Sequence, residues 1–194
     1  MIAPPERSAE RDSALRATLP HVPALGWTPA ALRAGLVDLG EPAAAAEWLF
    51  PRGTTGMVEA FADLADREAV RAAGALEALR TGPRIRALLA ARLRWLEPWR
   101  EAERRAVALL ALPWNAAVAA RVAGRTADAF WLAAGDTSTD MSRYTRRMTL
   151  AGIHVATIAF WLRQPAPEME EVLAFLDRRL AGLARMQRRA APRT

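Results

Sequence analysis

The chain has 194 residues and 52% apolar side chains, which suffices for one globular core and is marginal for two. It contains no cysteine, so disulfides, iron–sulfur clusters and thiol chemistry are excluded. All 27 basic residues are arginines. The net charge of +6 suits nucleic acid, an anionic membrane surface or an acidic partner, but arginine–alanine enrichment is also typical of a GC-rich genome.

Alanine and leucine dominate the chain, which favours an all-α fold. A first helix is predicted over residues 8–19, before two prolines. Thr28 as N-cap and Pro29 at the first helical position begin a second helix, which Gly40 closes. A short third helix over 42–50 completes a pattern that is typical of a helix-turn-helix.

Apolar residues three and four apart predict six further helices, about nine in total. The first covers about 55–79 and ends before the clearest break, at 81–83. Beyond the break we expect helices around 85–96, 107–112, 113–134 and 144–162, and a last helix from Glu168. Gly135 is predicted to end the long helix before it as a C′ residue. No charge-free run exceeds sixteen residues, too short to span a membrane.

The residue inventory argues against an enzyme, a cofactor or a metal site. Without lysine the chain has neither a P-loop nor a Schiff base, and it has no G-x-G-x-x-G or G-x-S-x-G motif. His21 and His154, the only histidines, are far apart, and no Glu-x-x-His pair exists. His154 is predicted to be a buried, hydrogen-bonded residue on an apolar helix.

The candidate recognition helix lacks the chemistry that reads DNA. Residues 41–50 carry two carboxylates and four alanines but no polar donor for base edges, and phosphates would repel the carboxylates. We therefore expect no nucleic acid partner. The alternative, a TetR-type DNA-binding regulator with a lipid-like effector, would need a basic reading surface elsewhere.

The C-terminal half holds five of the seven tryptophans. One interpretation is a tryptophan-rich core. The other is a cavity with aromatic and aliphatic walls that holds a long apolar ligand. Periodicity alone leaves both open and slightly favours the core.

Residues 135–147 form a polar corner between two apolar helices. Thr137 and Asp140 fit a capping box, which explains the first half structurally. The second half places three arginines beside the only tyrosine, and arginine and tyrosine are typical interface residues. We predict a partner-binding surface with these members: Asp136, Asp140, Arg143, Tyr144, Arg146 and Arg147.

Short motifs along residues 11–186 resemble, in their order, the ubiquinone-biosynthesis lipid-binding accessory proteins of mitochondria and related bacteria. They are HVP at 21–23, GWT at 26–28, LFPRG at 49–53, IR at 85–86, LP-x-N at 112–115, RTAD at 125–128, GDTSTD at 135–140, YTRR at 144–147, LAGI at 150–153 and FLDRR at 175–179.

The resemblance implies a single TetR-like all-α domain over 1–194, with a degenerate helix-turn-helix at about 8–53 and a lipid-binding and dimerisation part at 54–189. It implies a non-catalytic homodimer that holds an isoprenoid quinone intermediate or phospholipid and presents it to the demethoxyubiquinone hydroxylase. The dimer interface is expected at Leu173, Leu176 and Leu180 on the last helix. The expected lipid-binding residues are Leu93, Leu96, Leu110, Trp114, Val118, Val122, Trp131, Ile153 and Trp161.

Two features depart from the family pattern. Mitochondrial members carry a tryptophan where this chain has Arg143, so docking of the hydroxylase is expected to use different contacts. They also have an additional amphipathic membrane helix, which is expected to be missing here, with the arginines near the C-terminus as a weak substitute. The N-terminal residues have no apolar core, so a bacterial cytoplasmic protein is expected, with transient contact at the inner membrane.

Overall fold

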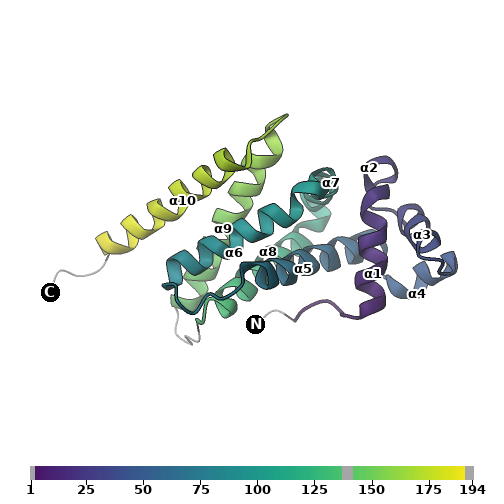
Figure 1. The fold of residues 1–194 in the computed structure, drawn as a ribbon, viewed down its shortest axis with the longest axis horizontal. Helices are drawn as coiled ribbons and strands as arrows, with labels where there is room; N and C mark the ends of the chain where they lie inside the picture. Colours follow the sequence, from purple (N-terminus) through teal and green to yellow (C-terminus); the bar gives the residue numbers. More distant parts are fainter. Residues whose placement is uncertain (1–2, 137–141, 191–194) are drawn as a thin grey trace.

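The computed structural model describes residues 3–136 and 142–190, and within these ranges the chain forms helices without strands. Two of the ten α-helices are single turns, and four short 3-10 segments join the others (Figure 1). The α-helices are α1 (Ala9–Thr18), α2 (Val22–Leu25), α3 (Pro29–Asp38), α4 (Ala46–Leu49), α5 (Gly53–Ala73), α6 (Thr81–Leu96), α7 (Arg100–Leu110), α8 (Ala116–Ala133), α9 (Ser142–Arg163) and α10 (Met169–Ala190).

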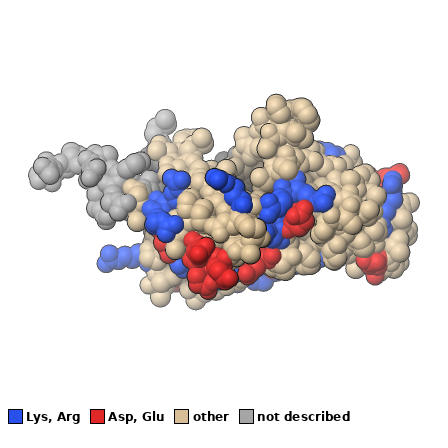
Figure 2. All heavy atoms as spheres, turned by 90° about the horizontal axis from the view of Figure 1, so that it is seen from above, with Lys and Arg blue, Asp and Glu red and all other residues tan. Residues whose placement is uncertain are grey.

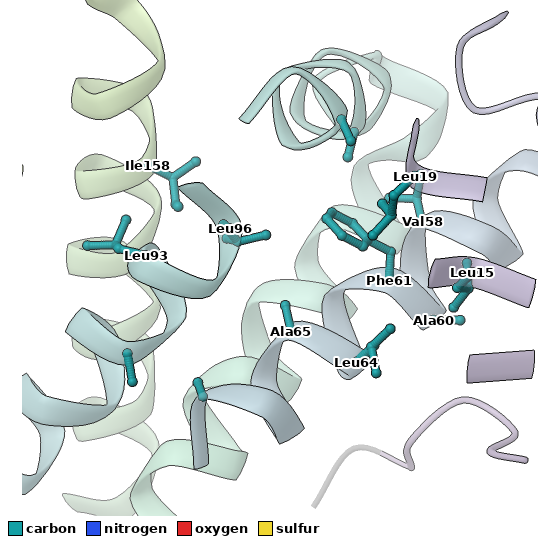
Figure 3. Packing of buried hydrophobic residues seen from close by; sticks show 14 of the residues in the cluster. Leu15, Leu19, Val58, Ala60, Phe61, Leu64, Ala65, Leu93, Leu96 and Ile158 are labelled. Carbon is teal, nitrogen blue, oxygen red and sulfur yellow. The ribbon is translucent and has the colours of Figure 1, made fainter. Parts of the chain in front are cut away.

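The N-terminal helices form a small unit at one end of the molecule, and local sequence signals explain it (Figure 1). The Ser8 hydroxyl accepts a hydrogen bond from the Arg11 amide and caps α1. Thr28 caps α3 in the same way, with Pro29 in its first turn as predicted. Apolar residues of this unit pack on α5, where Leu15, Leu19, Val58 and Phe61 lie close together (Figure 3).

The remaining helices form the body of the molecule, with α5 at its centre. α5 packs on α6 and α8, α8 packs on α9, and α10 lies along α9 and α6 (Figure 1). The body shares one core with the N-terminal unit, because buried residues from α1 to α10 belong to a single apolar cluster. The structure is thus the all-α fold that composition predicted.

Some predicted elements have different boundaries, among them the helix expected around 107–112, which is α7 from Arg100 to Leu110. α5 ends at Ala73 rather than near Leu79, because Gly74 adopts a φ of 66° that favours glycine and stops the helix. The expected third helix over 42–50 is a 3-10 turn followed by the four-residue α4.

The end of α8 is the stop that the sequence predicted. Gly135 has a φ of 84°, its amide donates to the Leu132 carbonyl at 3.0 Å, and the Asp136 amide donates to the Trp131 carbonyl at 2.9 Å. This pair of bonds is a Schellman motif with Gly135 at C′.

Among the described helices, none alone combines the length and apolarity needed to cross a bilayer. One bent pair, Thr81–Leu110 with Pro113–Ala133, meets the length and composition criteria jointly.

Candidate ligand-binding pocket

A pocket of about 240 Å³ lies inside the body, where α5, α6, α7, α8 and α9 meet. Its walls are mostly apolar, with small residues from α8 and larger ones from α5 and α9. The lining residues are Val58, Phe61, Ala62, Arg92, Glu103, Ala106, Val107, Leu110, Ala111, Ala119, Val122, Ala123, Thr126, His154, Val155, Ile158 and Ala159.

Burial gives the pocket a closed end and an open end. Phe61, Arg92 and Thr126 are almost completely buried, and they form the floor. Ala111, Val155 and Ala159 are exposed, Val155 by 53%, and they form the rim. An apolar ligand can therefore enter from the surface and reach buried groups.

The floor carries a buried polar cluster centred on Arg92, whose side chain is 2% exposed. Its Nε donates to Asp66 Oδ1 at 2.8 Å, and Asp66 Oδ2 accepts from the Thr126 hydroxyl at 2.8 Å. Arg92 Nη1 lies 3.6 Å from Glu103 Oε1, beyond hydrogen-bond reach. This nitrogen has no hydrogen-bond partner, although it is buried. An unsatisfied buried donor costs free energy, typically about 1–3 kcal/mol.

Burial also governs the protonation of the floor. It raises the pKa of Asp66 to about 6, against the opposing effect of Arg92. Burial, assisted by the positive charge of Arg92, lowers the pKa of His154 well below its ordinary value. At neutral pH the imidazole is therefore uncharged, and it offers one donor and one acceptor nitrogen.

The predicted lipid-binding residues divide into three groups. Leu110 and Val122 line the pocket. Leu93, Leu96, Ile153 and Trp161 are buried in the surrounding core without lining it. The other three lie outside the lining set: Val118 and Trp131 are half-buried, and Trp114 is 76% exposed.

Sequence reasoning missed the contributions of α5 and the polar floor. Val58, Phe61 and Ala62 come from α5, which lies within the predicted lipid-binding part at 54–189, but none of the predicted lipid-binding residues was on this helix. His154 was predicted to be buried, and it is, at 8% exposure. A histidine and an arginine on strongly apolar helices were the available signal for Arg92 and His154.

A second buried carboxylate, Glu59 of α5, lies beside the pocket wall and connects α5 to α8. Its side chain is fully buried and accepts hydrogen bonds from Arg52 at 3.0 Å, Arg121 at 3.0 Å and Arg125 at 2.6 Å. Although burial acts to raise its pKa, these arginines outweigh that effect and lower the pKa to about 2.

The predicted partner surface is partly an internal ion cluster. Asp136 lies within 3.5 Å of Arg146 and 3.4 Å of Arg147, and Arg147 also pairs with Asp128. The Arg146 guanidinium lies over the Trp131 ring, 5.8 Å from its centre.

Other members of that surface differ in their surroundings. Tyr144 is 65% exposed and Met148, one turn later on α9, is 75% exposed. The capping box of Thr137 and Asp140 and the side chain of Arg143 lie outside the described residues.

The leucines predicted for the dimer interface are on α10. Leu173 is 8% exposed and Leu176 is fully buried within the single chain, and Leu180 packs partly buried against the same core. All three therefore contact the chain's own core in this structure, and dimerisation through α10 stays a prediction.

Comparisons with known proteins identify relatives in sequence and in fold. Residues 116–187 match the model of the COQ9 family. The chain is 32% identical to the ubiquinone biosynthesis protein COQ9, mitochondrial, of Rattus norvegicus over 174 residues, which cover 86% of this chain and 56% of that protein. The human protein of the same name is 32% identical, with 86% and 55% covered. The chain thus spans a little more than half the length of these relatives.

In three dimensions the chain is similar to a TetR transcriptional regulator from Nitrosomonas europaea, with a TM-score of 0.71 and 20% identity over 91% of this chain and 99% of that chain. At this identity the likeness concerns the fold, which is TetR-like, as the motifs implied. Together with the sequence matches, it shows that the chain is similar to COQ9 proteins over most of its own length and has a TetR-like all-α fold.

Proposed function

We propose that this protein is a non-catalytic lipid-binding accessory protein in ubiquinone biosynthesis, with an isoprenoid quinone intermediate as its ligand. The observation that carries the proposal is the pocket, which is apolar over most of its wall and reaches the surface at Ala111 and Val155. Its relatives are named for ubiquinone biosynthesis, whose intermediates carry long apolar tails.

The size of the pocket fits one end of such a ligand. About 240 Å³ is below the range of roughly 300–1,000 Å³ of typical small-molecule sites, so most of a long tail would lie at or beyond the rim. Burial of each methylene contributes about 0.8 kcal/mol, so even a partly enclosed tail would hold the lipid. Phospholipid chains could use the same walls.

The corner after α8 is the proposed docking surface for the enzyme that uses the ligand, in this family the demethoxyubiquinone hydroxylase. Ion pairs fix Asp136, Arg146 and Arg147, and such a rigid frame supports the exposed ring of Tyr144. Exposed aromatic residues on rigid frames are typical anchors of interfaces. A homodimer with transient contact to a membrane surface completes the proposal.

Features of the N-terminal unit favour this function over transcriptional regulation. α4, at the place of a recognition helix, has only four residues, and Glu47 and Trp48 are exposed on it. On the face in Figure 2, basic and acidic side chains are intermixed, and no continuous basic surface of the kind that binds phosphates is visible there.

The test is organic extraction of the purified protein followed by mass spectrometry of the extract. We expect an isoprenoid quinone intermediate or a phospholipid from the wild type. Val122→Trp fills the pocket and should abolish recovery. Val37→Trp is the matched control, because Val37 is 62% exposed on α3, and it should retain the lipid. A folded wild-type protein that yields no lipid contradicts the proposal, as does equal recovery from both variants.

A further inference from the structure

The closed end of the pocket holds a buried cation whose hydrogen bonds are incomplete. Arg92 lines the pocket with a side chain that is 2% exposed, and its Nη1 makes no hydrogen bond, because its ion-pair partner Glu103 Oε1 lies 3.6 Å away. Buried polar groups of folded proteins nearly always find partners, so a ligand oxygen beside this side chain would complete the set.

A second polar group lies at the same end. The His154 imidazole is buried, lines the pocket, and is close enough to feel the charge of Arg92. As a neutral ring it can donate to one ligand oxygen or accept from a hydroxyl. The other floor residues, among them Phe61 and Ile158, are apolar and suit the faces of a flat ring.

Charge distinguishes between the possible head groups. The floor combines one positive charge on Arg92 with carboxylates at Asp66 and Glu103, so its net charge is −1 when both are ionised and zero when one is protonated. A phosphate would add negative charge to a site whose net charge is already zero or −1, and its burial there would be unfavourable. A neutral ring with carbonyl or hydroxyl oxygens adds none.

We propose that Arg92 Nη1 and His154 form a head-group subsite at the pocket floor, which takes the neutral oxygen-bearing ring of an isoprenoid quinone or phenol and directs its tail towards Ala111 and Val155. This inference rests on the proposed function and adds to it an orientation and a head-group selectivity. The ring enters first, and the rim holds the tail.

The test compares three probes of equal tail length by titration calorimetry: decylubiquinone, decylbenzene and decyl phosphate. We expect the wild type to bind decylubiquinone most tightly. A hydrogen bond in a buried site corresponds to roughly a three- to tenfold gain, so the two bonds together predict a preference over decylbenzene of about tenfold or more.

Substitutions at His154 and Arg92 test whether these residues cause the preference for decylubiquinone over decylbenzene. His154→Leu keeps an apolar floor and should reduce the preference by roughly three- to tenfold, while decylbenzene binding stays unchanged. His154→Gln keeps a donor and an acceptor and should restore part of it. Arg92→Lys keeps the charge beside Asp66 and Glu103 but lacks the second terminal nitrogen, so it should also lose preference. Thermal unfolding shows which variants are folded.

Val122→Ala is the matched control, since it shortens an apolar side chain of the wall and should change decylubiquinone and decylbenzene binding alike. The subsite is overturned if the wild type binds decylbenzene as tightly as decylubiquinone, if decyl phosphate binds best, or if His154→Leu weakens both apolar-tailed probes equally. These results leave the apolar pocket in place. Failure of all three probes to bind the folded wild type overturns the proposed function as well.

Discussion

Glu59 and Asp66 are seven residues apart on α5, and both connect that helix to α8. Their surroundings nevertheless shift their pKa values in opposite directions. Glu59 is shared by three arginines, which lower its pKa to about 2. Asp66 shares one arginine with Glu103, and burial raises its pKa to about 6. Folding therefore favours the ionised form of Glu59 and disfavours that of Asp66.

The opposite pKa shifts distinguish Glu59, which joins two helices, from Asp66, which lies in the polar cluster at the pocket floor. Three arginines pair with the single carboxylate of Glu59. Two of them, Arg121 and Arg125, belong to α8, so the ion pairs join α8 to α5. The cluster around Asp66 has one cation, Arg92, for the two carboxylates of Asp66 and Glu103, and Arg92 Nη1 makes no hydrogen bond. Burial therefore disfavours the ionised form of Asp66, whereas the three arginines favour that of Glu59.

The largest expected effect concerns Glu59. Glu59→Gln leaves three arginines without their shared charge, and we expect a loss of about 2 kcal/mol or more of unfolding free energy at pH 7. Urea denaturation measures it. Because the pKa of Glu59 is lowered, the advantage of the wild type should disappear as the pH falls from about 4.5 towards 2.

The matched control for this substitution is Glu77→Gln, at an exposed turn position, which we expect to change stability by less than about 0.5 kcal/mol. Equal effects of the two substitutions would show that the three arginines contribute nothing through Glu59.

The next effect has the opposite sign. Asp66→Asn should leave stability unchanged near pH 4 and raise it by about 1–2 kcal/mol at pH 7, because the raised pKa means that the wild type loses stability as Asp66 ionises between about pH 4 and 6. Arg92 keeps Glu103 as its counter-charge. Denaturation curves at both pH values measure the change, and destabilisation at pH 7 would contradict the comparison.

His154 provides a third pH signature. Its lowered pKa means that the unfolded chain binds a proton below about pH 6.5 that the folded chain does not, so stability falls on acidification. Arg92 acts on its charge, and Glu103 is the other charged residue that lines the same pocket. His154→Leu should remove this loss, so the stability of the variant should fall less than that of the wild type between pH 6.5 and 5. If wild type and variant show the same pH dependence in this interval, the imidazole is not held neutral.

The smallest effect is expected at an exposed ion pair. Arg86 and Asp177 join α6 to α10 with two bonds of 2.9 and 3.0 Å, but both side chains are about half exposed. Asp177→Asn should therefore cost less than about 1 kcal/mol, and added salt should reduce the cost further. If Asp177→Asn lowered the unfolding free energy as much as Glu59→Gln, burial would not explain why buried ion pairs contribute more stability than exposed ones.

Local signals predicted much of the fold. Thr28 and Pro29 begin α3 and Gly135 ends α8 where the sequence indicated, because caps depend on a few neighbouring residues. The end of α5 was missed, since Gly74 lies within a stretch whose apolar spacing continues to Leu79.

The sequence suggested an apolar pocket but did not identify most of the residues that line it. Five helices line it, and periodicity does not fix how each is rotated against the others. Trp114 was therefore assigned to the wall although it is exposed, and Phe61 was not assigned although it is part of the floor. The partners of Arg92 lie 26 and 11 positions away along the chain, which local spacing does not indicate.

A structure of the protein with decylubiquinone bound would show the orientation of the ligand in the pocket. We expect the quinone ring at the pocket floor, with an oxygen within about 3.2 Å of Arg92 Nη1 and the tail leaving past Ala111 and Val155. A ligand with its tail against Arg92, or one bound entirely outside the space between α5, α6, α7, α8 and α9, would contradict this expectation.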